Sequence, residues 1–158
     1  MTTPLRSLIH CYSPTGERYK PTIRPTSGFS ANADSEHLRQ AMRGLGTDEK
    51  AIIAILGRRT SAERFAIREA YKATFDKKLE DVLSSELSGK FKTLAKKLSM
   101  TPWEVMAKAL YKAMQGPGTK ERVLIEVLAT CSNDDIVELK KILPASPGGG
   151  RQIQRPNP

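Results

Sequence analysis

The sequence has few cysteines, few aromatic residues and no long apolar run, and each scarcity excludes a class of protein. Cys11 and Cys131 are the only cysteines among 158 residues, too few for a disulfide framework or a structural zinc site. Aromatic residues make up 6% of the chain, little for a protein that stacks nucleic-acid bases. No apolar run approaches the roughly 20 residues of a membrane span, and the first residues lack the apolar core of a secretory signal. We therefore expect a soluble protein of a reducing compartment.

Positive charge is in excess, because 26 Lys and Arg residues face 17 Asp and Glu residues, for a net charge of +9. Such a balance indicates affinity for an anionic partner. The basic residues are spread along the chain, whereas a nucleic-acid footprint gathers on one face or one helix. A nucleic acid is therefore not the expected partner, and salt-sensitive, calcium-independent binding to one ranks as the third hypothesis.

The apolar pattern predicts an all-α chain between two irregular ends. Residues 1–29 contain four prolines and no helical or strand period, so we expect a mostly extended N-terminal arm. Residues 144–158, rich in Pro and Gly, are expected to form a disordered tail. Between them apolar residues recur three and four positions apart, as in amphipathic helices. This spacing predicts five helices in residues 30–99 and about three in residues 100–143.

An internal repeat organises the helical region, because the chain overlays itself when it is shifted by 72 residues. Residues 41–47 then fall on residues 113–119. The later matched positions are Glu49 and Glu121, Ile53 and Ile125, and Leu56 and Leu128. The apolar pattern of residues 79–98 does not return, since Pro and Gly follow residue 143. We read one complete unit and a partial second one.

The loop of residues 42–47 joins two of the predicted helices and allows two interpretations. In the structural one, Gly44 ends the first helix, Gly46 relieves a second strained position, and Thr47 caps the next helix. In the functional one, the two glycines let backbone carbonyls turn outward together, as calcium ligands do. Glu86, at another helix junction, could add a carboxylate. The spacing alone favours the structural interpretation.

Loop, acidic residue and repeat together resemble the annexin family. The family's loop pattern is [KR]-G-x-G-T, which Arg43 to Thr47 matches, and an acidic residue follows about 40 positions later, as Glu86 follows Gly46. Residues 85–91, Ser-Glu-Leu-Ser-Gly-Lys-Phe, are similar to the family's cap motif. The resemblance covers roughly residues 21–143. It implies an annexin-type five-helix repeat in residues 30–99 and a partial repeat in residues 100–143.

The resemblance also implies Ca²⁺ as the bound ion, with ligands in the first repeat. The main site would use the carbonyls of Met42, Gly44 and Gly46 and the carboxylate of Glu86. A weaker accessory site would use the carbonyl of Thr47 with Glu49. Arg43 and Lys90 would flank these loops and face lipid headgroups.

The second repeat departs further from the family pattern. Its loop is similar in form, so the resemblance implies a weak metal site there. The residues concerned are Met114, Gly116, Gly118, Thr119 and Glu121. The carboxylate expected 40 residues after Gly118 falls instead on Pro158, so the main ligand set of this repeat is incomplete.

The first functional hypothesis is calcium-dependent binding to anionic phospholipid such as phosphatidylserine, with Ca²⁺ bridging protein and membrane. It places the protein in the cytoplasm, reversibly at the inner face of the plasma membrane or of vesicles. No catalytic constellation is visible, and we do not expect an enzyme.

The alternative is a truncated interaction or regulatory annexin product, with little membrane binding of its own. It would self-associate or pair with another annexin chain through its incomplete second repeat. The side chains expected to lose packing partners there are Leu110, Leu124, Leu128, Ile136 and Leu139.

Overall fold

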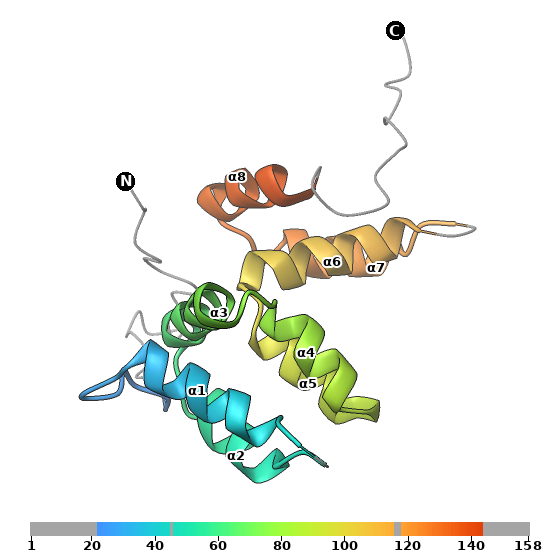
Figure 1. The fold of residues 1–158 in the computed structure, drawn as a ribbon. Helices are drawn as coiled ribbons and strands as arrows, with labels where there is room; N and C mark the ends of the chain where they lie inside the picture. Colours follow the sequence, from blue (N-terminus) through green and yellow to red (C-terminus); the bar gives the residue numbers. More distant parts are fainter. Residues whose placement is uncertain (1–21, 45, 116–117, 144–158) are drawn as a thin grey trace, which may run out of the picture. The chain divides into compact units, whose positions relative to one another are not determined.

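A computed structural model describes residues 22–44, 46–115 and 118–143. Within these ranges the chain forms eight helices and no strand (Figure 1), which confirms the all-α prediction. Most of the expected N-terminal arm, residues 1–21, and the expected tail, residues 144–158, lie outside the described residues.

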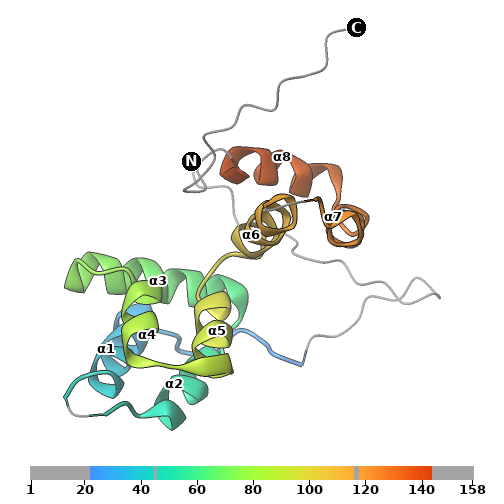
Figure 2. The same cartoon turned by 90° about the vertical axis from the view of Figure 1, so that its right-hand side faces the viewer.

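The chain divides into two compact units between Thr101 and Pro102. The first unit contains α1 (Ala31–Ala41), α2 (Glu49–Leu56), α3 (Ser61–Phe75), α4 (Leu79–Glu86) and α5 (Gly89–Leu98). The second contains α6 (Pro102–Met114), α7 (Glu121–Leu128) and α8 (Asn133–Ile142). Figures 1 and 2 show the helices of each unit from two sides.

All five helices of the first unit contribute to one apolar core. Its fully buried side chains include Leu38 of α1, Leu56 of α2, Tyr71 of α3 and Leu83 of α4, and α5 adds Ala95. These residues stand at the helical spacing that the sequence shows, because only one stripe of each helix can face the core.

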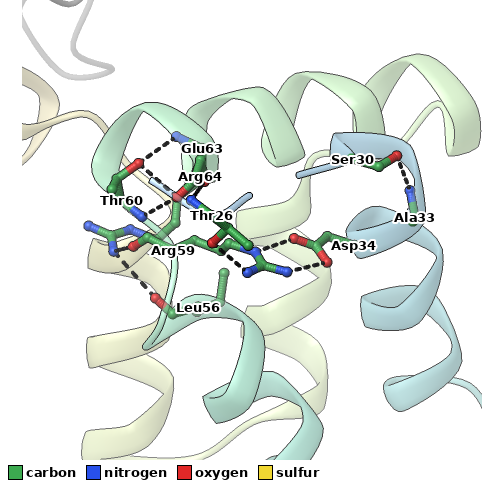
Figure 3. A network of polar contacts seen from close by, with 9 residues as sticks. All are labelled: Thr26, Ser30, Ala33, Asp34, Leu56, Arg59, Thr60, Glu63 and Arg64. Atoms are coloured by element: carbon green, nitrogen blue, oxygen red, sulfur yellow. Dashed lines mark hydrogen bonds and ion pairs between the residues drawn. The ribbon is translucent and has the colours of Figure 1, made fainter. Parts of the chain in front are cut away.

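A polar network joins the start of α1 to the α2–α3 junction (Figure 3). Arg59 donates from Nε and Nη2 to the two carboxylate oxygens of Asp34, at 2.5 and 3.0 Å. A third hydrogen bond runs from Arg59 Nη1 to Thr26 Oγ1, at 2.9 Å. The hydrogen bond with Asp34 is the main reason that the pKa of Arg59 is raised. Arg59 therefore ties two helices and the segment before α1 together.

Glu63, which is only 7% exposed, carries a second part of this network. Its carboxylate accepts hydrogen bonds from the backbone N–H groups of Thr26 and Thr60, both at 2.7 Å, and from the Thr60 hydroxyl at 2.9 Å. Burial disfavours the charged form, but these three hydrogen bonds, with the nearby Arg59 charge, outweigh it and lower the pKa of Glu63. The bond from the Thr60 N–H, together with one from the Glu63 N–H to the Thr60 hydroxyl at 3.3 Å, forms the capping box that begins α3.

The second unit has a smaller core, centred on Ala107, Leu110 and Leu139. Trp103 Nε1 donates to Asp135 Oδ1 at 2.9 Å and links α6 to α8. Leu110 and Leu139 are buried, so the expectation that they lose their packing partners is wrong. The contact between α6 and α8 covers them, and Leu124 and Val127 of α7 pack against the same cluster.

Side chains that the 72-residue repeat matches differ in burial between the two units, because among the described residues only the first unit has a fourth and a fifth helix. Leu56 is 1% exposed and its counterpart Leu128 is 45% exposed. In the first unit α4 and α5 complete the core with Leu83 and Ala95. The described part of the second unit has only α6, α7 and α8, which leaves the side chain of Leu128 partly in solvent.

We predict that Leu56→Ala lowers the free energy of unfolding by about 2–5 kcal/mol, because it leaves a cavity in a closed core. Leu128→Ala should cost about 1 kcal/mol or less, because solvent already reaches the site. Urea unfolding followed by circular dichroism measures both. Equal losses at the two positions would contradict the difference in packing.

Glu63→Gln should destabilise the first unit by about 1–3 kcal/mol at neutral pH, because it weakens three hydrogen bonds to a buried charge. The folded pKa of Glu63 is lowered. Its stabilising effect is therefore fully present above the unfolded value of about 4.3 and is lost as the pH falls through the folded pKa. Thermal unfolding from pH 7 to pH 3 should show the variant and the native chain converging. Glu36→Gln, at an exposed position of α1, should show no such convergence.

Candidate metal centre

The loop between α1 and α2 adopts the backbone that its glycines allow. Gly44 and Gly46 have φ of +104° and +90°, in the left-handed region that favours glycine. No atom lies within 4 Å of the Cβ that either residue would gain, so the backbone and not crowding requires glycine. The Asp48 N–H donates to the Ala41 carbonyl at 2.8 Å and closes the loop.

Asp48, and not Thr47, caps α2. Its side chain accepts a hydrogen bond from the Ala51 N–H at 3.0 Å, so the expectation that Thr47 is the cap is wrong. The charged carboxylate suits the positive end of the helix dipole better than a hydroxyl does. The Thr47 hydroxyl instead lies 3.4 Å from both the carbonyl oxygen and Oε2 of Glu86.

Glu86 thus lies beside the loop despite its distance in sequence. It is the last residue of α4 and is exposed. Figures 1 and 2 both draw the α1–α2 loop and the α4–α5 junction at one end of the first unit. A carboxylate at the C-terminal end of a helix meets the negative pole of the helix dipole, so a nearby cation is favoured there.

The loop also offers the oxygens that a hard cation needs. Within the described residues, no hydrogen-bond donor is directed at the carbonyls of Met42, Gly44 or Gly46. Calcium takes six to eight oxygen ligands, including backbone carbonyls and bidentate carboxylates. The described ranges contain no cluster of three or more His, Cys, Asp or Glu residues that could hold a metal. A site here would therefore use main-chain carbonyls and the single carboxylate of Glu86, which is a set that suits calcium.

The other predicted residues of this unit surround the loop. Glu49 is exposed in the first turn of α2, and its N–H donates to the Thr47 carbonyl at 3.2 Å. That carbonyl keeps one lone pair for a further partner. Arg43 in the loop and Lys90 in the first turn of α5 are both exposed.

The loop between α6 and α7 repeats the backbone of the first loop at both of its ends. The Lys120 N–H donates to the Ala113 carbonyl at 2.9 Å, and the Glu121 N–H donates to the Thr119 carbonyl at 3.1 Å. Gly118 has φ of +86°. Gly116 lies outside the described residues. The backbone of a carbonyl site is therefore partly present in the second unit.

The side chains of the second loop differ from those of the first. Lys120 stands where Asp48 caps α2, and it makes no side-chain cap. Met114 is 44% exposed, whereas Met42 is 4% exposed. Within the described part of the second unit, the Thr119 side chain makes no hydrogen bond to a carboxylate. The second loop thus has the form of the first but lacks the contact with a carboxylate.

None of the described helices has the length and apolar character needed to cross a bilayer.

Comparison with known proteins relates both units to one family. The family model described as Annexin matches residues 33–98 and 105–142. Annexin B22 of Schistosoma mansoni is 51% identical over 132 residues, which are 83% of this chain and 36% of that protein. Human annexin A13 is 48% identical over 126 residues, 80% of this chain and 40% of that protein. The chain thus spans well under half the length of these relatives.

Solved structures of annexins are similar to this chain as well. The crystal structure of calcium-bound annexin (Sm)1 superposes with a TM-score of 0.83 at 44% identity, covering 95% of this chain and 44% of that one. Chicken annexin V gives a TM-score of 0.70 at 42% identity, covering 79% of this chain and 40% of that one.

Gly46→Ala should lower the free energy of unfolding by about 1–2 kcal/mol, because alanine is strained at positive φ. Gly118→Ala should cost a similar amount, since its φ is nearly the same. Thermal unfolding measures both variants. A neutral Gly46→Ala would show that the loop does not hold the left-handed conformation in solution.

Proposed function

The chain belongs to the annexin family, and on that premise we propose that it binds anionic phospholipid membranes in a calcium-dependent manner. The observation that carries the proposal is the contact between Thr47 of the α1–α2 loop and Glu86 at the end of α4. It brings a carboxylate to a loop whose carbonyls at Met42, Gly44 and Gly46 accept no hydrogen bond within the described residues. The calcium-bound state of annexin (Sm)1 adds support from a related protein.

The proposed ligands of the main site are the carbonyls of Met42, Gly44 and Gly46 and the carboxylate of Glu86. One charged ligand among neutral ones makes for weak binding in solution, on the order of 10⁻⁴–10⁻³ M. Calcium bound there would offer its remaining coordination positions to lipid phosphoryl or serine carboxylate oxygens. Lipid and calcium would then tighten each other's binding by the same factor.

Two basic side chains and a weaker accessory calcium site would strengthen membrane binding around the main site. Arg43 and Lys90, both exposed, would each contribute about 1 kcal/mol near an anionic surface. That is too little to hold the protein without calcium at physiological salt. The Thr47 carbonyl with Glu49 would form a weaker accessory site.

The second loop would bind calcium more weakly still. Its proposed ligands are Met114, Gly116, Gly118, Thr119 and Glu121, and it has no counterpart of Glu86 within the described residues.

We propose no catalytic activity, since the family consists in general of calcium- and phospholipid-binding proteins. The membrane reached would be the inner face of the plasma membrane or of vesicles, from the cytoplasm. A second candidate function is association with another helical chain, or with a second copy, through the second unit. It is favoured by the exposure of Ile125, Leu128 and Val137.

Co-sedimentation with phosphatidylserine vesicles tests the proposal. The native chain should sediment in calcium and be released by a chelator, and phosphatidylcholine vesicles should not retain it. Glu86→Gln should raise the calcium concentration for half-maximal binding by about tenfold or more, because it removes the only charged ligand. Glu36→Gln makes the same charge change on the exposed surface of α1 and should bind like the native chain.

Two results would contradict the proposal. One is a folded native chain that stays in the supernatant with calcium, and the other is equal binding by the two glutamine variants. If the chain fails to sediment and its size grows with concentration without lipid, the second candidate function is favoured instead.

A further inference from the structure

The Thr47 side chain connects the two halves of the candidate site. Its hydroxyl lies 3.4 Å from Glu86 Oε2 and 3.4 Å from the Glu86 carbonyl oxygen, across 39 residues of sequence. Among the described residues of the α1–α2 loop, only Thr47 has a side chain that hydrogen-bonds Glu86. The contact can therefore affect the position of the Glu86 carboxylate relative to the loop.

The Thr47 hydroxyl is available for this contact because its neighbour performs the capping. Asp48 accepts the hydrogen bond from the Ala51 N–H that a cap must take. The Asp48 carboxylate thus caps the start of α2, and the Thr47 hydroxyl contacts the end of α4.

Glu86 gains from such a contact. It is exposed at the end of α4, so its long side chain is free to take many rotamers and loses that freedom when it binds a metal. A contact that restricts the side chain beforehand reduces this loss, as preorganisation does in general. The carboxylate has about four acceptor positions, so one hydroxyl still leaves both oxygens able to bind calcium.

The geometry points to Thr47 as a positioning residue, and we propose that its hydroxyl holds the Glu86 carboxylate toward the α1–α2 loop for calcium. This inference rests on the proposed function. The hydroxyl has one proton, and the charged carboxylate is a stronger acceptor than the neutral carbonyl. At 3.4 Å the contact is longer than a strong O–H···O hydrogen bond, so it restricts the position of the carboxylate only weakly.

The chain offers a control at Thr74, which is exposed in α3 and belongs to no proposed ligand set. Thr74→Val removes a threonine hydroxyl and keeps the shape of the side chain, as Thr47→Val does. It therefore reports what the loss of such a hydroxyl does to the first unit away from the α1–α2 loop and Glu86.

The first experiment is a calorimetric titration of the full chain with calcium alone. Thr47→Val keeps the shape of the side chain and removes the hydroxyl, and it should weaken binding about tenfold, the lower end of what outer-shell groups contribute. Thr47→Ser keeps the hydroxyl and should bind within about twofold of the native chain. Thr74→Val, which removes a hydroxyl from the exposed surface of α3, should bind like the native chain.

A second measurement does not depend on calcium. Amide hydrogen exchange in chelator reports how firmly the loop and the end of α4 are held together. Thr47→Val should speed exchange at Asp48 and Leu87, whose N–H groups bond to Ala41 and Leu83. Thr47→Ser should exchange at the native rates, and Thr74→Val should leave the rates at Asp48 and Leu87 unchanged.

Several results would overturn the inference. If Thr47→Ser is as weak as Thr47→Val, the methyl group and not the hydroxyl is responsible. If Thr47→Val matches Thr74→Val in both measurements, the contact has no role. A native chain that binds no calcium, alone or with phosphatidylserine vesicles, refutes the proposed function and this inference together. Native binding with an unaffected Thr47→Val refutes this inference alone.

Discussion

Burial of apolar side chains from five helices in one core determines where the loops of the first unit lie. Leu38, Leu56 and Leu83 are fully buried, and they belong to α1, α2 and α4. Once these stripes face one another, the direction and length of each helix place the α1–α2 loop and the end of α4 at the same end of the unit. Among the described residues, no short hydrogen bond or ion pair joins the two, and the Thr47 contact is 3.4 Å long. The geometry of the site therefore depends mainly on the core.

The opposite end of α2 is held by polar contacts instead. Arg59 bonds Asp34 and Thr26, and Glu63 accepts three hydrogen bonds. Arg59, Asp34 and Glu63 thus all have partners within the unit, which is what buried or half-buried charges require. Glu86 is the contrasting case, because it is exposed and lies at the unfavourable pole of its own helix. This contrast separates a carboxylate that serves the fold from one available to a cation.

The two units show that a loop motif is not sufficient for a site. Both loops close with the same backbone hydrogen bonds, and both match the Annexin family model. Within the part of the chain that the structure describes, only the first has a carboxylate in contact with its threonine. Two more helices are what bring that carboxylate, and they also bury Leu56, whose counterpart Leu128 is exposed. The same two helices, α4 and α5, thus complete both the apolar core and the proposed ligand set of the first unit.

Local physics explains what the sequence by itself determined. The helix positions follow from the apolar spacing, and the positive φ of Gly44 and Gly46 follows from the need to reverse the chain. The repeat, and the separation of Gly46 and Glu86 in sequence, can be read from the residues themselves. The tertiary structure alone decided the rest. Thr47 and Asp48 are both good caps, and only the nearness of α4 gives the hydroxyl another acceptor. The partners of Arg59 lie 25 and 33 residues away. Such pairings depend on how helices pack, because side chains distant in sequence meet only after their backbones have been placed.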